Sequence, residues 1–138
     1  MTRAFAATRE IDRPPAQVWA RLIDWDHAAP WLGVDAIHAG GATAVGTTLR
    51  FTARGKERTS EIAALDPGRS VTLRSRQGGV TADYTYGVEP SGAGSRVTLV
   101  ADVTTSGAWA LAGPMIRAAI RRSDRRQLDA FDRQLAAP

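Results

Sequence analysis

The sequence predicts an α+β protein in which an antiparallel sheet of six or seven strands packs against a long C-terminal helix, with two short helices after the first strand. Two patterns predict this fold class. Residues 34–104 alternate apolar and polar side chains and are interrupted by glycine-containing turns. Residues 12–32 and 109–135 instead show helical spacing. The length of 138 residues, with 43% hydrophobic and 23% charged residues, predicts a single domain over 1–138.

The first elements are a strand over residues 3–11 and a helix over residues 12–23. Phe5 and Ile11 lie on the same side of the strand, because successive side chains alternate between its faces. Asp12 is the expected N-cap of the helix, and the two prolines that follow suit its first turn, where a missing N–H costs no hydrogen bond.

A second helical turn is predicted over residues 24–32, with Asp24 or Asp26 as its cap and Pro30 ending or bending it. The two short helical segments together hold three of the chain's four tryptophans, Trp19, Trp25 and Trp31. Such crowding of large aromatic side chains near the start of the chain requires a physical reason.

The remaining strands are expected over residues 34–40, 47–55, 58–65, 70–76, 80–88 and 96–104. Their clean alternation indicates antiparallel strands with one buried and one solvated face. Threonine, arginine, aspartate and glutamate occupy the solvated face, where they can pair across strands. The expected inward side chains include Leu49, Phe51, Ser60, Ile62, Ala64, Leu73, Ser75, Ala82, Tyr84, Tyr86, Leu99 and Ala101.

The C-terminal segment returns to helical spacing, and we expect one long helix with an irregular start near Gly113 and Pro114. Its inward stripe comprises Trp109, Gly113, Ile116, Ile120, Asp124, Gln127, Phe131 and Leu135. The opposite face carries Arg121, Arg122, Arg125 and Arg126. We interpret this arginine face as solvated; a membrane-surface helix, a nucleic-acid patch and a protein-docking surface are alternatives. No aromatic residues interleave with the arginines, so no nucleic-acid partner is expected.

Composition excludes several kinds of chemistry. The chain has no cysteine, which removes disulfides, thiol catalysis and cysteine zinc sites. His27 and His38 are its only histidines, too few to suggest a zinc site, so no metal and no cofactor are expected. The glycine clusters are predicted turns rather than phosphate-binding loops. No secretory signal and no apolar run of membrane-spanning length are visible, so a cytoplasmic protein without stable membrane insertion is expected.

The segments IDRPPAQVWARLIDWDHAAPWL (11–32) and GPMIRAAIRRSDRRQLDAFDRQL (113–135), with the strands between them, resemble the SRPBCC superfamily. It includes START lipid-transfer domains and the polyketide cyclase/dehydrase family. The resemblance implies a helix-grip fold, in which a curved sheet wraps the long helix and leaves a cavity closed by the two short helices. The tryptophans would then form a lid: Trp19 packs it onto the sheet, Trp31 leans toward the cavity, and Trp25 is mostly exposed.

The inward face reads as an apolar pocket with few polar groups, which is typical of a small-molecule site. Its expected ligand-binding residues are Trp31, Leu49, Phe51, Ile62, Leu73, Ala82, Tyr84, Tyr86, Leu99, Trp109, Ile116 and Ile120. Tyr84 and Tyr86 are also the candidate catalytic residues, although both suit cross-strand packing with satisfied hydroxyls. No inward arginine is assigned on the clearly alternating strands, but Arg58 lies where it can reach one end of the cavity.

Three hypotheses follow. The first is binding of a small hydrophobic molecule, lipid-like or similar to an aromatic polyketide. The second is an enzyme of the polyketide cyclase, aromatase or dehydratase type that uses the pocket tyrosines. The third is an interaction protein that uses the arginine face, for which reversing the charge of Arg121 and Arg125 is the test. A homodimer through an exposed sheet edge or through the lid aromatics is compatible with each hypothesis.

Overall fold

The structure is a computed structural model that describes residues 2–107, 112–124 and 126–136. Two residues named in the sequence predictions, Trp109 and Arg125, lie outside these ranges. The α+β arrangement predicted from the sequence is confirmed, with an antiparallel sheet and helices at its C-terminal end.

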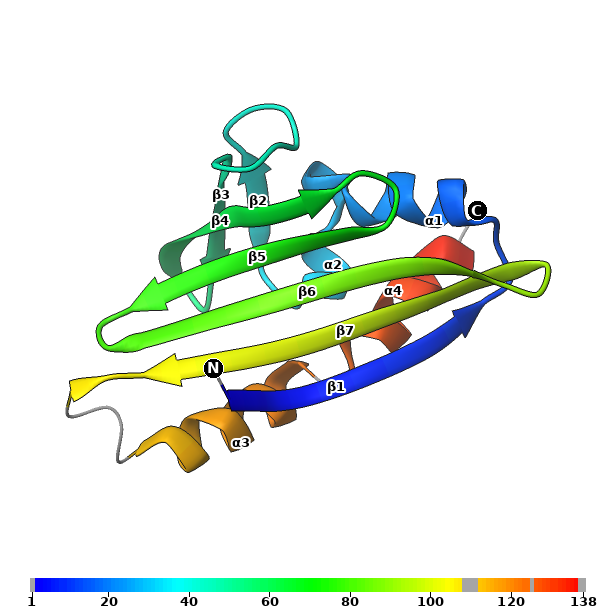
Figure 1. Cartoon of the computed structure of the whole chain (residues 1–138). Helices are drawn as coiled ribbons and strands as arrows, with labels where there is room; N and C mark the ends of the chain where they lie inside the picture. Colours follow the sequence, from blue (N-terminus) through cyan, green and yellow to red (C-terminus); the bar gives the residue numbers. More distant parts are fainter. Residues whose placement is uncertain (1, 108–111, 125, 137–138) are drawn as a thin grey trace.

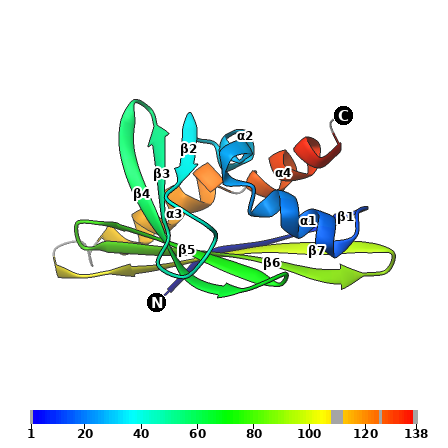
Figure 2. The same cartoon turned by 90° about the horizontal axis from the view of Figure 1, so that it is seen from above.

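The sheet has seven strands, all paired antiparallel, in the order β1-β7-β6-β5-β4-β3-β2. Their bounds are β1 Thr2–Ile11, β2 Ala36–Ala39, β3 Thr48–Ala53, β4 Lys56–Asp66, β5 Ser70–Gln77, β6 Val80–Ser91 and β7 Gly94–Thr105. Figures 1 and 2 show that the sheet is strongly curved: β2, β3 and β4 turn up beside the helices, which lie over β5, β6, β7 and β1. This curvature creates the concave face expected of a helix-grip fold.

The short helices are α1 (Pro15–Leu22), the 3-10 turn η1 (Trp25–His27) and α2 (Ala29–Leu32). The predicted cap at Asp12 is wrong, because α1 begins at Pro15 and has Pro14 as its N-cap residue. A residue that precedes a proline is kept out of the helical region, so Pro14 stays extended and the helix begins one residue later. Pro30 lies in the first turn of α2 instead of ending it, and Gly33 ends that helix with a positive φ of 76°.

The C-terminal helical segment consists of two helices, α3 (Gly113–Asp124) and α4 (Gln127–Ala136), instead of the single long helix predicted. The two helices have different neighbours. Both contact β1 and β7, and α4 also contacts α2. The predicted apolar stripe is therefore divided between the two helices. Ile116 and Ile120 of α3 pack against the core, and Phe131 and Leu135 of α4 are part of it. Figure 2 shows α3 and α4 following each other on the side of the sheet that also carries α1 and α2.

A β-bulge in β4 changes which residues face inward. The pairing of β4 with β5 shifts between Ile62 and Ala64, so the alternation that places Ser60 and Ile62 inside is reversed beyond this point. Ala64, predicted to point inward, is exposed, and Leu65 packs against the core instead. A bulge adds one residue to one strand and bends it, so this irregularity contributes to the curvature of the sheet.

The outer face of the sheet carries the cross-strand polar pairs that the alternation predicts. Arg74 on β5 donates two hydrogen bonds to its register partner Asp83 on β6, at 2.7 and 2.8 Å. Thr72 and Thr85 form the next pair, with hydroxyl oxygens 2.9 Å apart. These polar pairs lie on the convex face of the sheet, and apolar side chains occupy its concave face.

Candidate ligand-binding cavity

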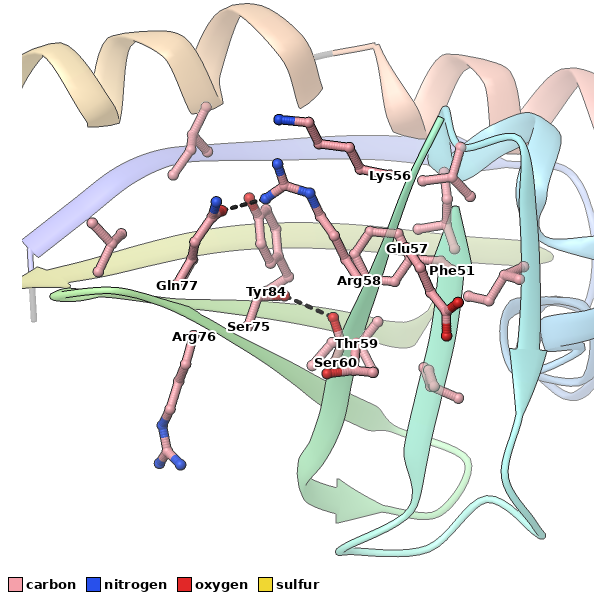
Figure 3. A pocket seen from close by; sticks show the side chains of 18 of the residues that line it. Phe51, Lys56, Glu57, Arg58, Thr59, Ser60, Ser75, Arg76, Gln77 and Tyr84 are labelled. Carbon is pink, nitrogen blue, oxygen red and sulfur yellow. Dashed lines mark hydrogen bonds between the residues drawn. The ribbon is translucent and has the colours of Figure 1, made fainter. Parts of the chain in front are cut away.

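A cavity of about 800 Å³ lies between the concave face of β3–β6 and helix α3. Its apolar walls come from the sheet, from α3 and from the end of α2. Figure 3 shows the polar residues at one end of this space, on β4, β5 and β6. The volume falls within the range of small-molecule sites, which is roughly 300–1,000 Å³.

Most of the residues that the sequence predicted to bind a ligand line this cavity. They are Leu49, Phe51, Leu73, Ala82, Tyr84, Tyr86, Ile116 and Ile120. Strand alternation brings the first six to the concave face, and helical spacing turns Ile116 and Ile120 of α3 toward it. The sheet and the helix thus contribute opposite walls of one apolar space.

Trp31, Ile62 and Leu99 were predicted to bind a ligand but are fully buried core residues that do not line the cavity. The helices α1, α3 and α4 all contact β7, so Leu99 is covered by protein. Ile62 lies where the segment before β3 closes on the sheet: Gly46 donates a backbone hydrogen bond to the Ile62 carbonyl at 2.8 Å. The alternation of side chains along a strand predicts which residues face inward. It does not predict whether an inward residue lines the cavity or is covered by other parts of the protein. Trp109 lies outside the described residues.

The tryptophans hold the short helices in place instead of lining the cavity. Trp31 of α2 makes edge-to-face contacts with Tyr86 on β6 and Phe131 on α4, with ring centroids 5.5 and 5.0 Å apart. Trp25, predicted to be mostly exposed, is only 4% exposed, and its indole N–H donates to the Thr43 hydroxyl at 3.1 Å. Trp19 is half-buried and packs against the core, as expected.

The segment around α2 contributes Leu32 and Val34 to the cavity wall. Sequence reasoning missed both residues because it assigned this role to Trp31. The helical spacing contained the signal: Trp31 and Leu32 are adjacent and point in different directions on a helix, so only one of them can enter the core. Leu32 and Val34 are half-buried, as walls of an open cavity are expected to be.

Two polar pairs lie within the apolar lining. The hydroxyl oxygens of Ser60 on β4 and Ser75 on β5 are 2.7 Å apart. The Tyr86 hydroxyl donates to Gln127 Oε1 at 2.6 Å, and both residues are buried. Tyr84, the other candidate catalytic residue, is half-buried on the same face of β6. The cavity therefore presents hydroxyl and amide groups to a bound molecule.

One end of the cavity is cationic. Lys56, Arg58 and Arg76 line it together with a single carboxylate, that of Glu57. Arg58 donates a hydrogen bond through Nη1 to Gln77 Oε1, and Figure 3 shows this contact close to Tyr84. The sequence placed Arg58 near a cavity end but missed Lys56 and Gln77. The strand β4 begins at Lys56, two residues before the predicted strand, which extends its inward-facing series.

The described residues lack what a metal site or a membrane-spanning helix requires. In the described ranges, no group of three or more His, Asp or Glu side chains is arranged to hold a metal ion. His27 is exposed and pairs with Asp24 at 3.0 Å, while His38 is exposed on β2; neither residue lines the cavity. None of the helices, as far as the structure describes them, is long and apolar enough to cross a membrane.

The arginine face of the C-terminal helices is partly occupied by the protein itself. Arg121 donates from Nε and Nη2 to the Ala4 carbonyl, at 3.2 and 3.0 Å. This carbonyl lies at the irregularity in β1 between Arg3 and Phe5, where a strand partner is missing from the ladder. Arg121 therefore ties α3 to β1, and its charge reversal would test folding as well as docking.

Comparison with known proteins agrees with this architecture. The family described as polyketide cyclase / dehydrase and lipid transport matches residues 2–136. No curated protein matches the sequence significantly. Among solved structures, TTHA0849 from Thermus thermophilus is 20% identical with a TM-score of 0.74, and the match covers 95% of each chain.

Two further solved structures share the fold. A START superfamily protein from Mycobacterium smegmatis is 12% identical with a TM-score of 0.76, and 96% of each chain is covered. The di-domain ARO/CYC protein BexL of the BE-7585A biosynthetic pathway is 19% identical with a TM-score of 0.80. That match covers 99% of this chain and 47% of BexL. At these identities the likeness establishes the fold alone.

Proposed function

Because this chain belongs to the polyketide cyclase / dehydrase and lipid transport family, we propose that it binds a small hydrophobic molecule in the cavity between β3–β6 and α3. The observation that carries the proposal is the cavity itself, about 800 Å³ in volume and walled mainly by aliphatic and aromatic side chains. Removing an apolar ligand from water into such a space contributes about 25 cal/mol for each Å² buried.

The volume of the cavity supports a ligand of lipid-like or polyketide-like size. The walls are carried by strands and by a helix, which hold their side chains more firmly than loops do. The few polar groups, such as the Ser60–Ser75 pair, are spaced along the walls and suit a molecule with scattered oxygen atoms. Both walls of the cavity come from the described part of this chain.

The test is titration of a neutral polarity-sensitive dye, Nile red, into the protein and into the plugged variant Ala82→Phe. Ala82 is buried, lines the cavity and lies between Ser75 and Val103 on the neighbouring strands. The matched control is Ala6→Phe, which adds the same side chain at an exposed position of β1. Stoichiometric binding by the wild type and by Ala6→Phe, lost in Ala82→Phe, is expected. Equal binding by all three proteins would refute the cavity as the site.

A second candidate function is catalysis of the cyclase, aromatase or dehydratase type, favoured by the hydroxyl of Tyr84 in the cavity. A phenol placed against a poly-ketone can donate or accept a proton during ring closure or loss of water. Tyr84→Phe should then slow turnover, and thermal unfolding of the variant verifies its fold. Full turnover in this variant would exclude the Tyr84 hydroxyl from the chemistry. Tyr86→Phe is a less clean test, because the Tyr86 hydroxyl also bonds Gln127.

A further inference from the structure

We propose that the ligand is an amphipathic carboxylic acid whose carboxylate is bound by Arg58 and whose apolar body lies along the walls formed by Leu73, Ile116 and Ile120. This inference deepens the proposed function and rests on it. It starts from the charges at the β4 end of the cavity: Lys56 and Arg58 share the inward parity of Ser60, whereas Glu57 and Arg76 leave their strands on the opposite face.

Arg58 lines the cavity and has a neutral hydrogen-bond partner. Arg9, Arg74 and Arg96 each pair with carboxylates. Arg58 instead donates to the amide oxygen of Gln77, and within the described part of the chain no carboxylate lies within ion-pairing distance of it. Arg58 is partly exposed, and an arginine without a counter-charge beside an apolar space attracts an anion, because charge interactions are screened less there than in bulk water.

The single carboxylate at this end of the cavity does not supply the missing charge. Glu57 lies between Lys56 and Arg58 on β4, so its side chain leaves the strand on the opposite face. Figure 3 shows the Glu57 carboxylate pointing away from the Arg58 guanidinium. Lys56 has the same parity as Arg58 and lines the same cavity, so it adds positive charge where the guanidinium lies.

The donors at this end suit a carboxylate better than another polar group. A guanidinium presents five N–H groups in a planar fork that matches the two oxygens of a carboxylate. Only one of these donors is bonded to Gln77. Because the Gln77 oxygen accepts that bond, its amide N–H groups remain to donate to the same anion. Gln77 thus orients the guanidinium and extends its set of donors.

The rest of the cavity determines the body of the ligand. Beyond the Ser60–Ser75 pair, two residues further along β4 and β5 from Arg58 and Gln77, the lining becomes apolar. A carboxylate at Arg58 therefore directs the attached chain or ring toward Leu73 on the sheet and toward Ile116 and Ile120 on α3. A long-chain or aromatic monocarboxylate has this distribution of charge and apolar surface.

The experiment measures displacement of Nile red by dodecanoate and by its neutral methyl ester, in the wild type, Arg58→Gln, Arg58→Lys and Arg76→Gln. Arg76 is the matched control, because it is also a cationic residue at this end but points away from Arg58 (Figure 3). Thermal unfolding of each variant verifies its fold. Gln77→Ala is added as a variant that keeps the charge and removes the protein partner of Arg58.

We expect the wild type to bind dodecanoate about ten-fold or more tightly than the ester, as charge-assisted hydrogen bonds require. The preference should disappear in Arg58→Gln, weaken in Arg58→Lys and in Gln77→Ala, and remain in full in Arg76→Gln. Equal displacement by acid and ester in the wild type, with Nile red still bound, would overturn this inference and leave the proposed function intact. A preference unchanged in Arg58→Gln would overturn it as well. If neither Nile red nor dodecanoate binds the wild type, both proposals fail.

Discussion

The hydroxyl of Tyr86 on β6 donates a hydrogen bond to the side-chain oxygen of Gln127, the first residue of α4, over 2.6 Å. Both side chains are buried, and Trp31 packs edge-on against the tyrosine ring. The bond therefore joins the sheet to the start of the last helix, and both of its residues line the cavity.

Replacing Tyr86 by phenylalanine should lower the free energy of unfolding by about 1–2 kcal/mol, because a buried hydrogen bond is lost and the polar atom of its partner stays buried. Urea denaturation followed by circular dichroism measures this change. Ser106→Ala is the control, since the hydroxyl of Ser106 makes only an exposed 3.4 Å hydrogen bond to the Gly79 carbonyl, and it should be close to neutral. A Tyr86→Phe protein as stable as the wild type would show that the bond contributes nothing net.

Truncation of Trp31 to alanine should destabilise the protein strongly, by about 3–5 kcal/mol, because its ring fills space between the sheet and α4. Trp31 is only 1% exposed. Trp19→Ala, at a half-buried position in α1, is the control and should cost clearly less. Thermal unfolding of the two variants provides the comparison. If Trp31→Ala is the milder change, the ring is a cavity wall rather than a core residue.

Arg9 on β1 holds α4 through two aspartates. Its Nε donates to Asp132 at 2.9 Å, and its Nη1 bonds Asp129. The hydrogen bond to Asp132, and the charge of both carboxylates, raise the pKa of Arg9. Arg9→Gln should therefore increase amide hydrogen exchange in α4 more than in β6, and should lower Tm. Arg96→Gln removes ion pairs on the outer face only, so exchange in α4 should not change. Unaltered exchange in Arg9→Gln would argue against this link.

Glu10 should contribute to loss of stability in acid. Hydrogen bonds from Ser91, and then from Arg96, hold the pKa of Glu10 below its ordinary value of 4.5. A carboxyl group whose pKa is lower in the folded state stabilises that state above the unfolded pKa, and the contribution is lost as pH falls through the folded value. Tm should therefore fall less between about pH 5 and pH 3 in Glu10→Gln than in the wild type. If Tm falls equally between these pH values in both proteins, Glu10 does not contribute to the loss of stability in acid.

The strands were predictable because a sheet with one solvated face must alternate apolar and polar residues, and this pattern is local. The position of the bulge was not, since Ser60, Ile62 and Ala64 continue the alternation without a break in the sequence. It is visible only in the pairing of β4 with β5, which the sequence of β4 does not contain. The two prolines were correctly associated with a helix start, but the restriction that one proline places on the other decided which residue begins it.

The sequence predicted that the cavity would be mainly apolar, but it predicted less well which residues line it. Inward parity selected the cavity walls Leu49 and Tyr84 and also the core residue Leu99, because parity records a face and not what covers it. Arg9 shares the inward parity of Phe5 and Ile11, and only the helix α4 packed against it reveals the aspartates that compensate its charge. Arg58 lacks such a compensating partner among the described residues, and this difference appears only in three dimensions.

The pairing of β1 with β7 has a consequence for how the chain reaches its fold. The strands β2 to β7 form a meander in which each strand pairs with the one before it, whereas β1 pairs with the last strand, with Thr8 opposite Thr98. Bringing these strands together closes a loop of roughly 90 residues, and such distant contacts slow folding. During synthesis β1 leaves the ribosome first and has no partner until β7 follows. The meander can assemble meanwhile, and the docking of β1 then provides Arg9 for the aspartates of α4 and the Ala4 carbonyl for Arg121.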